Sequence, residues 1–124
     1  MQLVLLIGLG GFLGTIARYL TGQLILRQVT PSFPYSTLIV NLFGCFLIGL
    51  IYGWFEKQHL ATNDWKLMLT AGFCGGFTTF SAFSIENIQL LRDGHFGMSI
   101  LYIFSSILLG LLLTIGGITL VKSI

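Results

Sequence analysis

The stretch Gly72-Phe73-Cys74-Gly75-Gly76-Phe77-Thr78-Thr79-Phe80-Ser81 decides the fold, because it is apolar and yet makes a poor helix interior. Adjacent glycines and two β-branched threonines both disfavour a continuous helix. The stretch lies inside an apolar segment from about 65 to 91, whose 27 residues would form a straight helix about 40 Å long. The hydrocarbon core of a bilayer is only about 30 Å thick.

Two interpretations of this segment remain open from spacing alone. One is a helix broken near Gly75–Thr79, and the other is a kinked or tilted helix with close glycine packing. Broken backbone at membrane depth is tolerated only where protein or a water-filled cavity covers it. Such breaks commonly present free carbonyl and N–H groups to an ion, so the stretch is also a candidate site.

The composition of the whole chain is that of a membrane protein. Hydrophobic residues make up 55% of the 124 residues, charged residues make up 8%, and the mean hydropathy is +0.94. An average soluble domain is about 25% charged, so this chain could not cover a soluble surface with polar groups. Lipid removes that difficulty, and we predict an all-α integral membrane protein.

The apolar segments predict four transmembrane helices in one domain over residues 1–124. Their approximate spans are 3–26, 35–55, 65–91 and 96–121. Two prolines interrupt the chain between 27 and 34, and a polar loop follows the second span, where Thr62 or Asn63 is a plausible helix cap. A tight polar turn at 92–95 separates the last two spans.

Small residues recur at i, i+4 spacing along the predicted helices, which lets backbones approach closely in lipid. The pairs are Gly10/Gly14, Gly49/Gly53, Gly72/Gly76 and Ser106/Gly110.

The basic residues divide evenly between the two sides of the predicted membrane domain. Lys57, Lys66 and Lys122 lie on one side, and Arg18, Arg27 and Arg92 lie on the other. Because the Lys/Arg difference sets orientation, this balance predicts insertion in both orientations and permits an antiparallel homodimer. The alternative is that one loop dominates and fixes the topology. The basic residues form no cluster, so we expect no nucleic-acid binding.

Few polar groups lie at membrane depth, and they are the functional candidates. The second span carries Thr37, Asn41, Gly44 and Ile48 on one stripe; the third carries Phe80, Phe83, Ser84 and Asn87, with Ser81 beside them; the fourth carries Tyr102, Ser106, Gly110 and Thr114. Neutral donors and the positive edges of aromatic rings suit a permeating anion. Alternatively, the polar groups join helices and the phenylalanines only pack.

Nothing in the sequence indicates an enzyme. The spans contain no histidine and no paired carboxylates, and the serines lack a base. Cys45 and Cys74 lie in apolar runs and are interpreted as small buried hydrophobic residues. We therefore expect no catalytic residues and no organic cofactor.

Three motifs, in this order and spacing, resemble the Fluc fluoride channels, also called CrcB proteins. They are Gly10-Gly11-Phe12-Leu13-Gly14-Thr15-Ile16-Ala17-Arg18-Tyr19, Ser36-Thr37-Leu38-Ile39-Val40-Asn41-Leu42-Phe43-Gly44 and Gly72 to Ser84. The resemblance covers essentially the whole chain. It implies a passive, highly selective fluoride channel in the inner (plasma) membrane, built as an antiparallel dual-topology homodimer with two pores.

The resemblance also implies roles for individual residues. Backbone carbonyls of Gly75 and Thr78 from both subunits would hold a structural Na⁺ at the dimer centre, and Glu86 would lie near a pore mouth. The fluoride pathway would use the ring edges of Phe80 and Phe83, the amide of Asn41, and the hydroxyls of Thr37, Ser81, Tyr102 and Ser106. Arg18 would make no direct ion contact.

Two rival functions remain open from the residues. The first is a small dual-topology, proton-coupled cation or drug antiporter, for which Glu86 would be the membrane-embedded carboxylate. The second is a non-transporting assembly subunit. Purified protein in liposomes separates the three functions by fluoride efflux without a proton requirement, proton-coupled drug uptake, or neither.

One residue departs from the family pattern, because Ala82 stands where the family usually has threonine. A hydroxyl is therefore missing beside Ser81, and the polar pathway is weakened. We predict that Ala82→Thr raises the rate of fluoride efflux from liposomes. Equal rates in the two forms would remove this idea.

Overall fold

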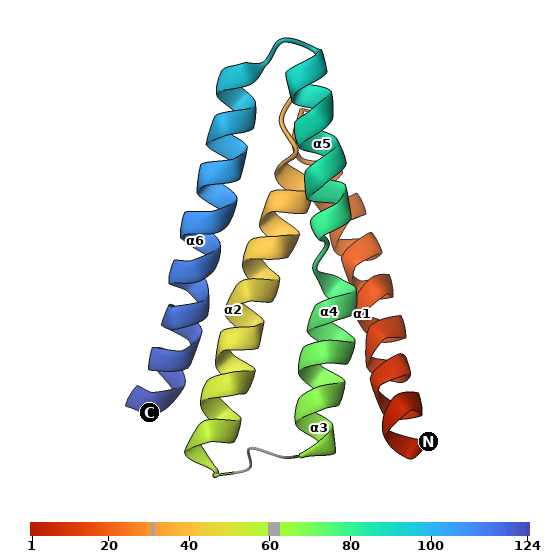
Figure 1. The fold of residues 1–124 in the computed structure, drawn as a ribbon, viewed down its shortest axis with the longest axis vertical. Helices are drawn as coiled ribbons and strands as arrows, with labels where there is room; N and C mark the ends of the chain where they lie inside the picture. The colour runs from red at the N-terminus through yellow and green to blue at the C-terminus, as the bar shows by residue number, and fades with distance from the viewer. Residues whose placement is uncertain (31, 60–62) are drawn as a thin grey trace.

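The computed structural model describes residues 1–30, 32–59 and 63–124, and the described residues form helices joined by short connections (Figure 1). The elements are α1 (Gln2–Leu26), α2 (Tyr35–Lys57), α3 (Asp64–Leu67), the π-helix η1 (Met68–Cys74), α4 (Gly75–Phe77), α5 (Phe80–Arg92) and α6 (Phe96–Ser123). α3 to α5 together form the third span.

The four predicted spans are confirmed, and each boundary lies within two residues of its predicted position. The helices that are long and apolar enough to cross a membrane are Gln2–Leu26, Tyr35–Lys57, Asp64–Arg92 and Phe96–Ser123. Hydropathy locates these segments well because the length of a span is set by the thickness of the hydrocarbon core.

Local chemistry explains where the third span begins and ends. The Asn63 side chain accepts a hydrogen bond from the Trp65 amide at 2.8 Å and so caps α3, as one of the two predicted caps. The other, Thr62, lies outside the described residues. At the far end, Gly94 adopts a positive φ of 79°, and the His95 amide returns to the Leu90 carbonyl at 2.8 Å.

Glycines bring α1 against the first half of the third span. A Cβ on Gly14 would overlap the Phe73 carbonyl oxygen, and a Cβ on Gly72 would lie 2.7 Å from the Ile7 carbonyl oxygen. α2 and α6 pack in the same way, because a Cβ on Gly117 would lie 2.6 Å from the Phe46 carbonyl oxygen. Close backbone contact therefore holds these helix pairs, as small residues do in lipid.

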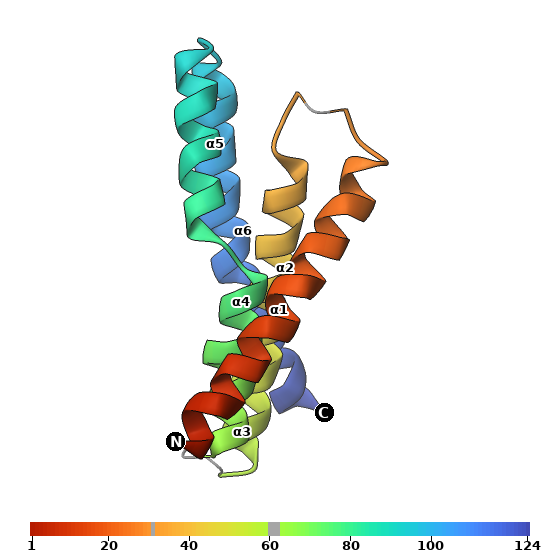
Figure 2. The same cartoon turned by 90° about the vertical axis from the view of Figure 1, so that its right-hand side faces the viewer.

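α5 pairs with α6 and not with α1. Figure 2 shows α5 beside α6 in the upper part of the molecule, while α1 and the start of α2 lie to the other side. The third span therefore changes partners along its length: its first half contacts α1, and its second half follows α6. The change of partner occurs where the helix is interrupted.

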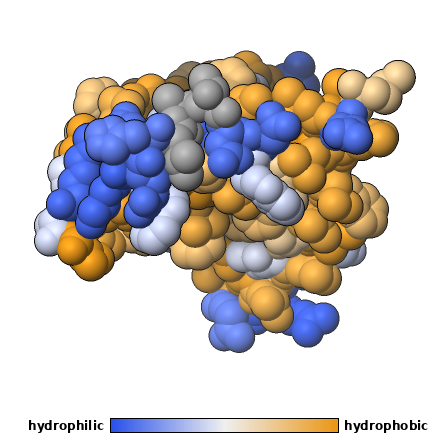
Figure 3. Space-filling model, turned by 90° about the horizontal axis from the view of Figure 1, so that it is seen from below, coloured by the Kyte–Doolittle hydropathy of each residue, from blue (hydrophilic) through white to orange (hydrophobic). Residues whose placement is uncertain are grey.

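Many large hydrophobic side chains along the helices are exposed. Seen from the end that carries both termini, hydrophilic side chains gather in patches among hydrophobic ones (Figure 3). Lys122 and Glu56 form an ion pair of 2.8 Å at this end, and the Lys66 ammonium lies 4.4 Å from the centre of the Tyr52 ring. A charged end and apolar flanks fit a protein whose helices cross a bilayer.

The glycine contacts predict a difference between two alanine substitutions in α1. In Gly14→Ala, the new methyl group would overlap the Phe73 backbone, which is held in its helix and cannot move aside. We therefore expect the free energy of unfolding to fall by about 1–3 kcal/mol. Gly8→Ala is the matched control, because a Cβ there meets nothing within 4 Å. Thermal unfolding in detergent compares them, and equal melting temperatures would contradict the packing described here.

Candidate functional site

The third span is broken at Thr78 and Thr79. Thr78 has φ −83° and ψ 159°, and Thr79 has φ −149° and ψ 118°, so both residues are extended. Helix resumes at Phe80, with the Thr79 hydroxyl accepting from the Ala82 amide at 3.3 Å. The break predicted near Gly75–Thr79 is therefore confirmed, and the kinked continuous helix is wrong.

The helix before the break differs from the prediction in one respect. Met68–Cys74 forms a π-helix, whereas the sequence predicted only an interruption further along. π-helical turns are rare and commonly lie next to functional sites. A π turn has no distinctive residue pattern, so the sequence carried no signal for it.

A side chain from α2 bonds both backbone groups of Thr79. The Asn41 Oδ1 atom accepts from the Thr79 amide at 2.7 Å, and the Asn41 Nδ2 group donates to the Thr79 carbonyl at 3.0 Å. One carboxamide thus satisfies both backbone groups of this residue. The amide nitrogen carries two N–H groups, so the bond to Thr79 uses only one of them.

The carbonyl groups of Gly75 and Thr78 are among those that lose their ordinary helical donors at the break. The helical partner of the Gly75 carbonyl would be the Thr79 amide, which donates to Asn41 instead. The helical partner of the Thr78 carbonyl would be the Ala82 amide, which donates to the Thr79 hydroxyl. Both carbonyls are therefore available to other donors or to a hard cation, which prefers oxygen ligands.

One side chain of α1 reaches this part of the backbone. Arg18 Nη1 donates to the Thr78 carbonyl over 3.4 Å, which is a long hydrogen bond. A carbonyl oxygen has two lone pairs, so this contact leaves one free. The contact also places a positive charge beside the break, on the side that faces the larger of two cavities.

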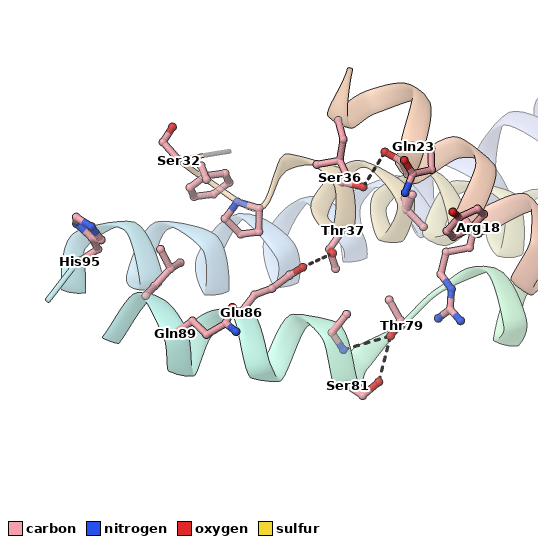
Figure 4. A pocket seen from close by; sticks show the side chains of 18 of the residues that line it. Arg18, Gln23, Ser32, Ser36, Thr37, Thr79, Ser81, Glu86, Gln89 and His95 are labelled. Atoms are coloured by element: carbon pink, nitrogen blue, oxygen red, sulfur yellow. Dashed lines mark hydrogen bonds between the residues drawn. The ribbon is translucent and has the colours of Figure 1, made fainter. Parts of the chain in front are cut away.

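The larger cavity, of about 870 Å³, lies between α1, α2 and α5 (Figure 4). Glu86 projects into it from α5, and its Oε1 atom accepts from the Thr37 hydroxyl at 2.6 Å. The Glu86 Oε2 atom accepts from the Tyr102 hydroxyl at 2.7 Å. Ser81 lines the same cavity near the break, with its hydroxyl 3.3 Å from that of Thr79.

The smaller cavity, of about 380 Å³, lies on the other side of the break. It is mostly apolar, and its polar lining residues include Asn41, Thr78 and Ser106. Phe80 and Phe83 also line it, with ring centres 5.5 Å apart. Thr79 lines both cavities, so the break stands between them.

Aromatic rings connect the two cavities along α5 and α6. The Phe83 ring meets the Tyr102 ring edge-on, with centres 5.0 Å apart and planes at 62°. Tyr102 is fully buried, whereas Phe80 is 78% exposed in the single chain. The rings of Phe80, Phe83 and Tyr102 therefore lead from an open apolar face toward the Glu86 carboxylate.

Comparison with known proteins assigns the chain to a family. The model described as "CrcB-like protein, Camphor Resistance (CrcB)" matches residues 5–118. This chain belongs to the CrcB family. The resemblance carried by the three sequence motifs is therefore confirmed, and four apolar helices make this family member a multi-pass membrane protein.

Several relatives in the CrcB family are named "Fluoride-specific ion channel FluC". The protein from Flavobacterium psychrophilum is 46% identical over 124 residues, which is the full length of both chains. The protein from Phocaeicola vulgatus is 49% identical over 112 residues, 90% of this chain and 92% of its own. The protein from Chlorobium phaeobacteroides is 46% identical over 119 residues, 96% and 92% of the two chains.

In this CrcB family member, the predicted site residues fall into two groups. The smaller cavity is lined by Asn41, Phe80, Phe83, Ser106, Gly75 and Thr78. The larger cavity is lined by Thr37, Ser81 and Glu86. Tyr102 joins the groups through its contacts with Phe83 and Glu86. All of the predicted residues therefore lie around the break.

The sequence interpretation missed residues that hold the site together. Thr79 lies in the third motif, where the sequence predicts no role for it, yet it provides the α5 cap and both partners of Asn41. The sequence predicts no role for Ser99 either, although its hydroxyl donates to Asn87 Oδ1 at 2.9 Å, and Asn87 donates to the Phe83 carbonyl at 2.8 Å. Ser99 is one turn before Tyr102 on α6, a spacing that could have drawn attention to it.

The contact between Ser99 and Asn87 predicts a stability effect. Ser99 is 1% exposed and Asn87 is 6% exposed, so Ser99→Ala leaves the Asn87 amide oxygen buried without this donor. We expect a loss of about 1–3 kcal/mol, measured by thermal unfolding in detergent. Ser123→Ala is the control, since that serine is exposed. Equal stability of the two variants would show that the contact contributes little.

Proposed function

We propose that this CrcB family member is a passive, highly selective fluoride channel. The observation that carries the proposal is the meeting of neutral donors and aromatic ring edges at a broken helix between two cavities. The relatives named as fluoride-specific ion channels, 41–49% identical to this chain, support the same ion. A pathway of this kind replaces water around a small anion without a full charge that would trap it.

The proposed pathway assigns each group a physical role. Fluoride would pass the positive ring edges of Phe80 and Phe83 and accept hydrogen bonds from neutral donors in the smaller cavity. Asn41 would offer the N–H that Thr79 does not use, and Ser106 would offer its hydroxyl. The larger cavity holds the Ser81 hydroxyl and the Thr37 hydroxyl, which donates to Glu86, and Glu86 marks the mouth.

An antiparallel homodimer is part of the proposal. The smaller cavity opens on an apolar face that includes the exposed Phe80 ring and Gly75. A second copy in the opposite orientation would cover this face, and the equal division of basic residues between the two ends permits both orientations. Each dimer would then contain two pathways.

The Gly75 and Thr78 carbonyls suit a structural Na⁺ at the centre of this dimer. Both lack their helical donors, and carbonyl oxygens are suitable ligands for a hard cation. Bound there, the ion would neutralise the partial negative charge that carbonyls carry at the end of a helix. The Arg18 guanidinium beside the Thr78 carbonyl is a competing positive group.

The cellular role follows from acid chemistry. Hydrogen fluoride is a weak acid that enters a cell from acid surroundings and dissociates inside, which traps the anion. A passive channel in the inner (plasma) membrane lets fluoride leave down its gradient without ATP or redox chemistry, and so reduces its toxicity.

The antiporter considered from the sequence receives no support. Its only candidate carboxylate, Glu86, has hydroxyl donors on both oxygens, from Thr37 and Tyr102. A carboxylate that exchanges protons with a substrate must be free to lose these partners. The relatives named above are ion channels and not antiporters.

Fluoride efflux from liposomes tests the proposal. Purified protein is reconstituted into vesicles loaded with potassium fluoride, and an electrode follows fluoride after a potassium ionophore removes the membrane voltage. We expect rapid efflux for the unmodified chain and efflux close to that of empty vesicles for Phe80→Ile, which loses the ring edge. Phe12→Ile changes a phenylalanine of α1 that lines neither cavity, and it should conduct normally.

Retention of fluoride by vesicles that contain well-folded, unmodified protein would refute the channel. Normal efflux in Phe80→Ile would leave the channel standing but would remove Phe80 from the pathway.

A further inference from the structure

The backbone polar groups of Thr79 lie at membrane depth and need hydrogen-bond partners within the protein. An unpaired N–H or C=O group costs several kcal/mol in lipid, because no water is available to bond it. Since Thr78 and Thr79 are extended, the Thr79 N–H group cannot bond the Gly75 carbonyl as it would in a continuous helix. A partner outside the third span must therefore supply an acceptor for this N–H group, and a partner that also donates to the Thr79 carbonyl holds the residue at two points.

Asn41 is suited to this task because its carboxamide repeats the geometry of a peptide group. It has an acceptor and a donor side by side, and the two bonds to Thr79 are 2.7 Å and 3.0 Å long. Aspartate has no donor and leucine has neither group, so no side chain of similar size except an amide meets both needs. Asn41 lies at the middle of α2, which places it at the level of the break.

We propose that Asn41 is the positioning residue of the break, which fixes within one chain where α5 begins and how its first residues are directed. By holding the Thr79 amide, Asn41 keeps that donor away from the Gly75 carbonyl. By holding the Thr79 carbonyl, it fixes the residue that immediately precedes Phe80. The contacts that hold the break in this way lie within a single subunit.

Two neighbouring contacts reinforce this arrangement. The Thr78 amide and hydroxyl both donate to the Cys74 carbonyl, at 2.9 Å and 2.8 Å, which ends the first half of the span firmly. The Thr79 hydroxyl then starts α5 by accepting from the Ala82 amide. Between these two ends, Asn41 supplies a partner from outside the third span to each of the Thr79 backbone groups.

Amide hydrogen exchange measures the proposal directly and does not depend on transport. Asn41→Leu keeps the approximate size of the side chain but removes both bonds, so amides in residues 77–82 should exchange roughly tenfold faster or more. Asn41→Asp still accepts from the Thr79 amide but cannot donate to its carbonyl, so we expect a smaller increase. Thr119→Val is the control, because its hydroxyl bonds only within α6.

A second variant tests the same contact without changing Asn41. Replacing the amide that precedes Thr79 by an ester removes the N–H group that donates to Asn41. Combined with Asn41→Leu, this ester should add little further destabilisation, because both changes remove the same bond. Fully additive effects of the two changes would overturn the proposal, and so would unchanged exchange in Asn41→Leu.

Selectivity provides a further readout, which rests on the proposed function. If Asn41 directs the start of α5, the ester at Thr79, which keeps the Asn41 amide, should lower the ratio of fluoride to chloride permeability, because the direction of Phe80 changes. A merely structural role would reduce the amount of folded protein and leave this ratio unchanged. If amides 77–82 exchange faster in Asn41→Leu while the unmodified protein conducts no fluoride, the channel is refuted and Asn41 is supported as the positioning residue.

Discussion

The structure depends on one constraint, which is that every backbone polar group in the membrane must find a partner inside the protein. A continuous helix meets this constraint by itself. The third span does not, because Thr78 and Thr79 leave the helical conformation at its middle. The site is therefore built where the constraint is hardest to meet, and residues of α1 and α2 supply the missing partners.

The break also separates electrical partial charges. The helical first half of the span ends with carbonyl groups directed at the break, and α5 begins there with amide groups, so a partial negative and a partial positive charge come close together. Carbonyls favour a cation and amides favour an anion. A neutral chain segment can thus present both polarities at membrane depth, with the Arg18 guanidinium as the formal charge beside it.

Two kinds of contact hold the helices together. Glycine contacts hold α1 against the first half of the third span and α2 against α6, and these contacts leave little freedom because they involve backbone atoms. The second half, α5, depends instead on side chains: the Asn87–Ser99 contact and the rings of Phe83 and Tyr102 join it to α6. The larger cavity opens between these two parts and admits the Glu86 carboxylate.

The sequence alone determined the membrane class and the four spans and located an interruption near Gly75–Thr79, because hydropathy and helix propensity are properties of neighbouring residues. Whether that interruption is a break or a kink was decided by the structure. It also singled out Asn41, Phe80 and Phe83, since polar groups and rings on one stripe of an apolar helix are visible in the sequence. Only the tertiary structure decided which groups meet. The pairing of Asn41 with Thr79, the two hydroxyl donors of Glu86 and the π-helix before the break depend on how α2, α5 and α6 cross. Those crossings are set by backbone contacts between residues far apart in the chain, such as Gly117 with Phe46, and spacing within a single helix carries no information about them.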